Sequence, residues 1–397
     1  MSTPDEKLVQ KSSGSRTGMY AAIAVVIVVL LVVVVAWQAG WLTSSPKPNS
    51  NGTTSCTPPT PETVTGSGST FVYPLMFTWE SAYTHSTVQY GSVGSGAGIS
   101  ALTQKTVDFG ASDAPLSPAQ QAALPGKVVT IPETAGGVAI IYNLPGVGAK
   151  VNFTGAILAQ VYLGNITQWN DAALQAANPN VSLPNQAIIV VHRQDGSGTS
   201  FAFTDFLTKS SSYWASNVGK STLPVWPTGV AQKGSGAMAT FVQSTPYTVG
   251  YVDLSYALTN GIQFGAVKNP AGANIVPTLA DTASAVHDGA TTLPLGDDMP
   301  GWYNVSLINQ AGATDYPITT FSYLMVYEQL DTVYGSAMTM NLAENLVNFL
   351  NWTITYGQSS TAQLYYVTLP ANVVTADQAS IQLVTYGAHP VPVCTAK

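Results

Sequence analysis

An uninterrupted apolar segment near the N-terminus limits what this chain can fold into. Residues Tyr20–Trp37 carry no charged side chain and consist mainly of Val, Ile, Leu and Ala. As a helix the segment would be about 27 Å long, which matches one hydrocarbon core. Trp37 and Trp41 stand where an interfacial aromatic belt would lie. We therefore predict a transmembrane anchor over residues 19–42.

The distribution of cations around this segment predicts its orientation. Lys7, Lys11 and Arg16 precede it, whereas only Lys47 follows shortly after it. The positive-inside rule then leaves residues 1–18 in the cytoplasm and the body of a single-pass cell-membrane protein outside. A cleaved signal peptide is the alternative, but the segment is long for one and no clear A-x-A site follows it.

Composition bounds the class of protein. The 397 residues are enough for more than one domain, and 46% of them are apolar, which favours a packed globular body. Only 8% are charged, against roughly 25% in ordinary soluble domains, so a buried arginine would stand out. A net charge of −7 argues against binding to nucleic acid, which needs clustered Lys and Arg.

Residues 43–65 are expected to form an extended linker, because they are rich in Ser, Thr, Pro, Asn and Gly. The chain has two cysteines, Cys56 in this linker and Cys394 near the C-terminus. A disulfide between them is permitted outside the cytoplasm and would fasten the linker to the body. Two free thiols or an intermolecular bond are the alternatives.

Sequons for N-glycosylation are only slightly more frequent than chance would give in a chain so rich in Ser and Thr. They are compatible with an exported, glycosylated surface but do not establish one. The candidate acceptors are Asn51, Asn152, Asn165, Asn180, Asn304 and Asn351.

The body after the linker alternates short strand-like and helix-like segments, which predicts an α/β fold. The strand candidates are Ser86–Gly91, Gly137–Tyr142, Ala187–His192, Val249–Val252 and Phe321–Tyr327. The helix candidates are Leu75–Tyr83, Ile99–Gln104, Phe201–Leu207, Ala237–Val242 and Asn341–Tyr356.

Three loops in this body share one design. Gly66–Phe71, Gly94–Gly98 and Asp195–Thr199 each bring glycine backbone and small hydroxyl side chains to the start of a predicted helix. Unpaired N–H groups and about half a positive charge collect at such a start, so each loop can bind an anion. One loop alone would be weak evidence, since Gly and Ser also make ordinary turns. Three converging loops could satisfy every oxygen of a small tetrahedral anion.

Several catalytic motifs are absent. Gly219-Lys220-Ser221 resembles the end of a P-loop, but Trp214 occupies the position of the first glycine. No serine has glycine at both i−2 and i+2, so there is no nucleophile elbow. The four histidines are scattered without metal-ligand spacing. Hydrolase or kinase chemistry therefore has no support in local motifs, although triads distant in sequence stay open.

Longer motifs resemble one family, the substrate-binding proteins of phosphate ABC importers. Val107–Ser117 reads VDFGASDAPLS and Arg193–Phe201 reads RQDGSGTSF, and both are near-exact, specific matches. Val161–Asp171, Val249–Val252 and Tyr316–Thr319 extend the resemblance. It covers the whole body but neither the anchor nor the linker.

This resemblance implies a two-lobed α/β fold of the type II periplasmic-binding-protein kind, with a hinge of crossing strands that closes over the ligand. Lobe I would comprise residues 66–136 and 316–397, and lobe II residues 137–315. The implied function is high-affinity, extracytoplasmic binding of inorganic phosphate and its delivery to the permease subunits of an ABC importer. No cofactor and no catalytic activity are expected.

The resemblance also implies which residues hold the anion. Arg193 would form charge-assisted hydrogen bonds, each worth roughly 1.5–3 kcal/mol. Asp195 would pair with Arg193 and fix its guanidinium, a plain helix cap being the alternative role. The remaining donors would be Thr70, Phe71, Ser95, Ser197, Gly198 and Thr199.

Asp113 would then set the choice of anion. A carboxylate in an anion site repels its ligand unless the ligand brings a proton that the carboxylate can accept. Phosphate near neutrality carries such a hydroxyl group and sulfate does not, so Asp113 would reject sulfate. The alternative is that Asp113 only caps the turn before Pro115.

Other functions stay open at this point. A surface sensor of phosphate or another oxyanion would use the same site without a permease. A structural surface protein would explain the anchor and the sequons but not the three loops. An enzyme such as a surface phosphatase would need a nucleophile or a metal site.

Overall fold

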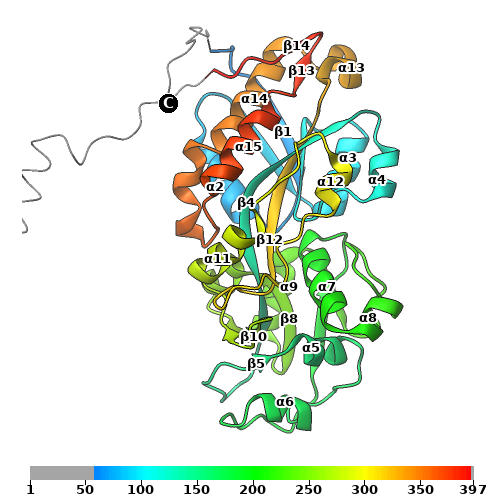
Figure 1. Ribbon diagram of the computed structural model, residues 1–397, viewed down its shortest axis with the longest axis vertical. Helices are drawn as coiled ribbons and strands as arrows, with labels where there is room; N and C mark the ends of the chain where they lie inside the picture. The colour runs from blue at the N-terminus through cyan, green and yellow to red at the C-terminus, as the bar shows by residue number, and fades with distance from the viewer. Residues whose placement is uncertain (1–57, 395–397) are drawn as a thin grey trace, which may run out of the picture. The chain divides into compact units, whose positions relative to one another are not determined.

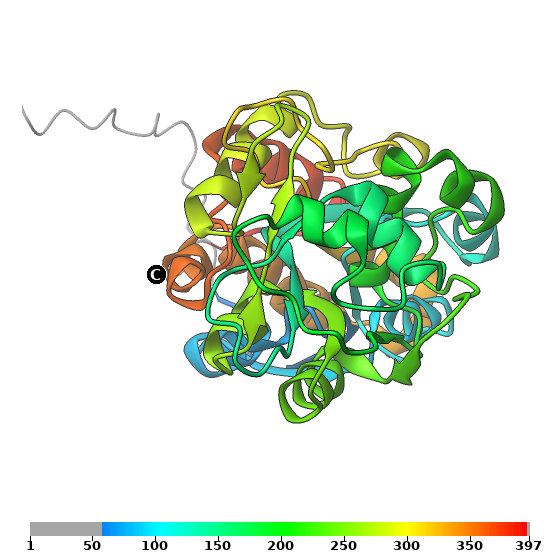
Figure 2. The same ribbon diagram turned by 90° about the horizontal axis from the view of Figure 1, so that it is seen from below.

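Two long strands run through the centre of the molecule and join its two lobes. The computed structural model, which describes residues 58–394, places them at β4 (Val128–Tyr142) and β12 (Thr319–Tyr327) (Figure 1). Every residue of both strands is buried. Strands of this kind are covered on both faces, and in Figure 2 helices surround the central strands.

The pairing of β4 changes along its length. From Val128 to Gly137 it pairs with β12, and from Val138 to Tyr142 it pairs with β8 (Thr248–Asp253). One strand thus belongs to the sheets of both lobes and joins them. The lobe boundary proposed from the sequence, between residues 136 and 137, lies one residue before this change of partner.

Lobe I is built on a sheet with the order β2-β1-β3-β12-β4. Its parallel strands are β1 (Thr63–Gly68), β2 (Thr87–Ser92) and β3 (Phe109–Ser112). Its helices and small hairpin are α2 (Tyr73–Ala82), α3 (Ser95–Thr103), α4 (Pro118–Ala123), α13 (Leu330–Tyr334), α14 (Met340–Thr353), α15 (Ala371–Ile381), β13 (Thr385–Tyr386) and β14 (His389–Pro390), with short 3-10 turns at Gly335–Ala337, Tyr356–Ser360 and Ala362–Leu364.

Lobe II continues the sheet from β4 through β8 and β6 (Ile189–Arg193) to β7 (Val230–Gln232). The two outer pairings, of β6 with β8 and with β7, are parallel. Its other elements are α5 (Gly155–Tyr162), α6 (Ala172–Ala177), α7 (Gly198–Ser210), α8 (Ser212–Asn217), α9 (Gly234–Ser244), α10 (Leu254–Thr259), α11 (Leu279–Gly289), β5 (Asn152–Phe153), β9 (Gln263–Phe264), β10 (Ala266–Lys268) and β11 (Asn274–Ile275).

One segment assigned to lobe II by the sequence packs on lobe I instead. The backbone of Gly296 accepts a hydrogen bond from Thr130 and donates one to Ser380 Oγ, both in lobe I. The short helix α12 (Met299–Tyr303) follows, and its Trp302 ring packs edge-on against Tyr323 of β12. The predicted range 137–315 for lobe II is therefore wrong around α12.

The predicted strands and helices all overlap observed ones, but the sequence missed some elements. It assigned residues 43–65 to the linker, yet Thr63–Thr65 pair with Thr87–Gln89 in the parallel ladder of β1 and β2. This linker boundary is wrong, because the glycine-rich β1 lacks the apolar alternation that marks a strand. The sequence also missed β3 and the first nine residues of β4.

The predicted cytoplasmic segment 1–18 and anchor 19–42, like the linker up to residue 57, lie outside the described residues. Within residues 58–394, the structure has no helix that is both long and apolar enough to span a membrane.

We predict that Trp79→Ala destabilises the protein strongly. Trp79 on α2 is fully buried, packs edge-on against Trp352 and donates through its indole N–H to the Gly357 carbonyl. Truncation of a buried Trp leaves a cavity and costs about 3–5 kcal/mol. Chemical denaturation should show this loss, whereas Phe77→Ala on the same helix should cost far less, because Phe77 is 58% exposed. Equal losses for the two variants would contradict the packing described.

Candidate functional site

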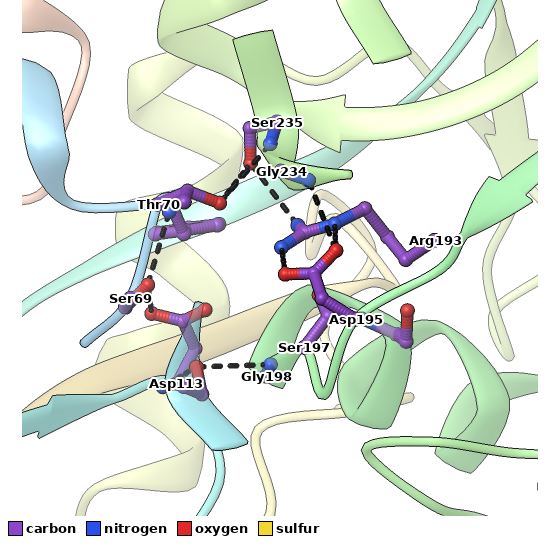
Figure 3. A network of polar contacts seen from close by, with 12 residues as sticks. Ser69, Thr70, Asp113, Arg193, Asp195, Ser197, Gly198, Gly234 and Ser235 are labelled. Atoms are coloured by element: carbon purple, nitrogen blue, oxygen red, sulfur yellow. Dashed lines mark hydrogen bonds and ion pairs between the residues drawn. The ribbon is translucent and has the colours of Figure 1, made fainter. Parts of the chain in front are cut away.

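Strand ends from both lobes meet at one place. In lobe I, β1, β2 and β3 end just before Ser69, Ser95 and Asp113. In lobe II, β6 ends at Arg193 and β7 ends just before Ser235. Ligands of open α/β sheets bind outside the carboxyl ends of parallel strands, where helices begin. The residues at these ends are drawn together in Figure 3.

Arg193 is held in place by Asp195. Its side chain is buried, with only 3% of the residue exposed. Arg193 Nε lies 2.8 Å from Asp195 Oδ1 and Nη2 lies 2.5 Å from Oδ2, a bidentate pair. Burial would raise the pKa of Asp195, but the hydrogen bonds and charge of Arg193 hold that pKa below its ordinary value. Asp195 therefore stays ionised and fixes the guanidinium.

The other face of this pair touches the start of α9. Arg193 Nη1 donates to Ser235 Oγ at 3.3 Å, and the Gly234 amide donates to Asp195 Oδ1 at 2.9 Å. The sequence analysis did not select Gly234 or Ser235. Residues 234–236 read Gly-Ser-Gly at a helix start, which is the same signal that marked the three predicted loops.

Thr70 and Ser95 connect the two lobes. Thr70 Oγ1 accepts from the Ser235 amide at 3.1 Å and lies 2.9 Å from Ser235 Oγ. Ser95 Oγ accepts from the Gly198 amide at 3.0 Å. Thr70 and Ser95 belong to lobe I, while Gly198 and Ser235 belong to lobe II, so these contacts hold the lobes together. Figure 3 shows the contact of Thr70 with Ser235.

Glycine backbone from the two lobes comes into close contact. The Gly96 amide donates to the Gly196 carbonyl at 2.8 Å. A Cβ atom on Gly96 would lie 3.0 Å from Gly196 Cα, and a Cβ atom on Gly198 would lie 2.6 Å from the Asp113 amide nitrogen. Side chains at these positions would keep the loops apart.

Ser197 and Thr199 lie at the start of α7. Ser197 is the N-cap residue, and its Oγ accepts from the Ser200 amide at 3.1 Å. Thr199 is buried, and within residues 58–394 its hydroxyl group makes no direct hydrogen bond. The hydroxyl nevertheless lies near enough to Asp113 to help lower the pKa of that carboxyl. An unpartnered buried hydroxyl is costly, so a ligand that accepts from Thr199 would remove a penalty.

Phe71 is placed differently from the expectation. Its backbone amide donates to Ser69 Oγ at 3.0 Å, so within the chain this donor already has a partner. The same Ser69 hydroxyl donates to Asp113 Oδ1 at 2.5 Å. Ser69 thus links the first loop to Asp113, a role that the sequence analysis did not assign.

Asp113 is buried among donors. It is 1% exposed, and its Oδ1 accepts from Ser69 and, at 3.0 Å, from Ser322 Oγ. Burial raises the pKa of Asp113 to about 6, although the hydroxyl groups and the charge of Arg193 pull it downward. Both hydroxyl bonds go to Oδ1, so an acceptor position remains on Oδ2.

Two further sets of predicted residues lie away from this site. Cys394 is disulfide-bonded, while its predicted partner Cys56 lies outside the described residues. Among the sequons, Asn165, Asn180 and Asn304 are exposed and Asn152 is half-buried. Asn351 is only 9% exposed within α14, which argues against glycosylation there. Asn51 lies outside the described residues. Among residues 58–394, no group of His, Cys, Asp or Glu could hold a metal ion.

Comparison with known proteins gives consistent matches. The family described as "PBP superfamily domain" matches residues 53–355. The phosphate-binding protein PstS of Xylella fastidiosa (strain 9a5c) is 36% identical over 331 residues, covering 81% of this chain and 86% of that protein. PstS of Haemophilus influenzae is 35% identical over 315 residues, covering 78% and 90%.

A solved structure supports the fold. The phosphate-binding protein from Stenotrophomonas maltophilia aligns with a TM-score of 0.62 at 21% identity, covering 80% of this chain and 93% of that one.

We predict that Gly198→Ala weakens the binding of inorganic phosphate about tenfold or more. The added methyl group would overlap Asp113, and relieving such an overlap costs about 1–3 kcal/mol. Calorimetric titration with phosphate measures the loss. Gly236→Ala is the matched control, since its Cβ would meet nothing nearer than Tyr256 at 3.8 Å. Unchanged affinity in Gly198→Ala would contradict the close approach of the lobes.

Proposed function

Because this chain belongs to the PBP superfamily and to its PstS phosphate-binding proteins, we propose that it binds inorganic phosphate outside the cytoplasm for an ABC-type importer. This family consists of substrate-binding proteins, so the chain acts by binding and release rather than by catalysis. The permease subunits of the importer are its proposed protein partners.

The site carries the chemistry that such a ligand requires. Arg193 supplies a buried positive charge, and Asp195 holds its fork ready for a tetrahedral anion. The starts of α3, α7 and α9 add backbone and hydroxyl donors around it. We propose that Thr70, Ser95, Ser197 and Thr199 donate to the ligand, together with Ser235. We propose further that the amides of Phe71 and Gly198, which donate to Ser69 and Ser95 in this structure, turn to the ligand when it binds.

The buried carboxyl of Asp113 is the observation that selects phosphate. It lies beside the donors, where an ionised group would repel any anion unable to donate a hydrogen bond. Phosphate at neutral pH has a hydroxyl group that can donate to the open position on Asp113 Oδ2. Sulfate has none and would meet only repulsion.

The anchor and the surface features complete the proposal. Residues 19–42 would span the membrane, with residues 1–18 in the cytoplasm and the body outside. A Cys56–Cys394 disulfide would fasten the linker to lobe I, and the exposed sequons Asn165, Asn180 and Asn304 are the best glycosylation candidates. A phosphate sensor without a permease is the alternative function, since it would use the same site.

We predict that Asp113→Asn lowers the phosphate-over-sulfate preference about tenfold or more. Asparagine can donate to sulfate and no longer repels it, and a charge-assisted hydrogen bond is worth roughly 1.5–3 kcal/mol. Calorimetry with the two anions gives the ratio. Asp297→Asn, which removes a surface carboxylate paired with Lys127, is the control and should leave the ratio unchanged. An unchanged ratio in Asp113→Asn would refute the selective role.

We predict that non-reducing peptide mapping of membrane-derived protein will recover the apolar segment and a peptide that joins Cys56 to Cys394. The first result follows from an uncleaved anchor and the second from the disulfide. A mature N-terminus near Ser44 would show that the segment is a cleaved signal peptide. Separate peptides for the two cysteines would exclude the proposed pairing.

A further inference from the structure

A β-bulge in the hinge directs a buried carboxyl group toward the site. Along the pairing of β4 with β12, Pro132 lies opposite Tyr323 and Thr134 lies opposite Ser322, which leaves Glu133 as the extra residue. A bulge of this kind re-aims one side chain of its strand. The Gln358 side chain donates to the Glu133 carbonyl at 2.9 Å, which satisfies the acceptor at the bulge.

The Glu133 side chain reaches Asp113 through a single hydroxyl group. Ser322 Oγ lies 2.9 Å from Glu133 Oε1 and 3.0 Å from Asp113 Oδ1. A serine hydroxyl has one hydrogen, so it can donate to only one of the two carboxyl groups. If both were ionised, one contact would place two lone pairs against each other. The geometry therefore requires a proton on one of the two carboxyl groups.

The surroundings place this proton on Glu133. Asp113 accepts from two hydroxyl groups and lies in the field of Arg193, all of which stabilise its ionised form. Glu133 is fully buried, its Oε2 has no hydrogen-bond partner, and it forms no ion pair within residues 58–394. An unpartnered carbonyl oxygen of a neutral acid costs far less than an unpartnered carboxylate oxygen.

We propose that Glu133 is a protonated positioning residue that donates to Ser322, so that Ser322 in turn donates to Asp113 and holds it as an ionised acceptor for phosphate. Glu133 lies on β4, the strand that joins the two lobes, and its proposed action on the ligand runs through Ser322 and Asp113. This inference rests on the proposed function and adds to it the group that keeps Asp113 in its selective state.

The charges around the pair are consistent with this order of protons. Burial and the negative charge of Asp113 raise the pKa of Glu133 to about 8, although the Ser322 bond lowers it. The groups that interact electrostatically with Asp113 are Arg193, Asp253, Tyr90 and Tyr323, and Tyr90 also faces Glu133. Burial raises the pKa values of both tyrosines and of Asp253 as well, and Arg193 is the cation of this surrounding group.

The proposal predicts a pH dependence that belongs to Glu133. Above a pH of about 8, Glu133 loses its proton, Ser322 is drawn away from Asp113, and a second buried negative charge faces the anion. Apparent affinity falls with the protonated fraction, so the Kd for phosphate should rise about tenfold for each pH unit above that midpoint. Glutamine keeps the shape, is neutral, and can still donate to Ser322.

The test compares the full-length protein with Glu133→Gln by calorimetry with phosphate and sulfate from pH 6 to pH 9.5. At each pH, the phosphate Kd of the unsubstituted protein is divided by the phosphate Kd of Glu133→Gln. This ratio cancels the titration of phosphate itself. The ratio should be flat at low pH and should rise above about pH 8. Glu344→Gln on α14 is the control and should follow the unsubstituted protein.

Ser322→Ala should lower the phosphate-over-sulfate preference. The double variant Ser322→Ala with Glu133→Gln should have nearly the same preference as Ser322→Ala alone.

Infrared spectroscopy supplies a reading that does not depend on the variants' affinity. The difference between the spectra of the unsubstituted protein and Glu133→Gln should contain a protonated-carboxyl band that disappears as the pH rises through about 8. A flat Kd ratio together with no such band, in a protein that binds phosphate, would overturn the role of Glu133 alone. Failure of the unsubstituted protein to bind phosphate would instead overturn the proposed function and this inference with it.

Discussion

The bidentate pair of Arg193 with Asp195 is the contact on which the rest of the site depends. Arg193 is the only Lys or Arg that is buried among residues 58–394, and Asp195 accepts from two of its donors as a bidentate partner. The pair also hydrogen-bonds to the start of α9, where Gly234 donates to Asp195 and Ser235 accepts from Arg193. Without Asp195, the buried guanidinium of Arg193 would lack both a fixed orientation and a counter-charge. The donors at the starts of three helices would then surround a cation that is not held in place.

The hinge contributes more than a pivot. Because β4 is shared between the two sheets, its residues are fixed relative to both lobes, and the bulge at Glu133 lies in the half that pairs with β12. Ser322 lies on β12 and hydrogen-bonds to both Glu133 and Asp113, so Asp113 is tied to the pair of strands that joins the lobes. The pair of strands β4 and β12 therefore contributes both to recognition of the anion and to the connection between the lobes.

Sequence reasoning found the parts of the site that leave a local pattern. The Arg193–Thr199 loop and Asp113 were identifiable because glycine, hydroxyl and charged residues stand together before helices or within a specific motif. The start of α9 carries the same pattern but was missed, since β7 before it has only three residues, none of them buried, and gives no strand signal. Glu133 could not have been found, because a bulge is a shift of register between two strands far apart in sequence. The position of α12 on lobe I escaped for a similar reason: its anchoring contacts are backbone hydrogen bonds of Gly296.

The meeting of Gly96 with Gly196 has a thermodynamic consequence. The two loops touch through bare backbone and one hydrogen bond, and the neighbouring bridges of Thr70 with Ser235 and Ser95 with Gly198 are polar. These polar groups can bond to water when the contact opens, so their hydrogen bonds contribute little net free energy to holding the lobes together. The free energy that keeps the lobes closed must then come mainly from the anion, which both lobes would contact. In a binding protein built in this way, the conformation depends on whether the anion is bound. A partner that binds the open conformation more tightly would therefore favour release of the anion.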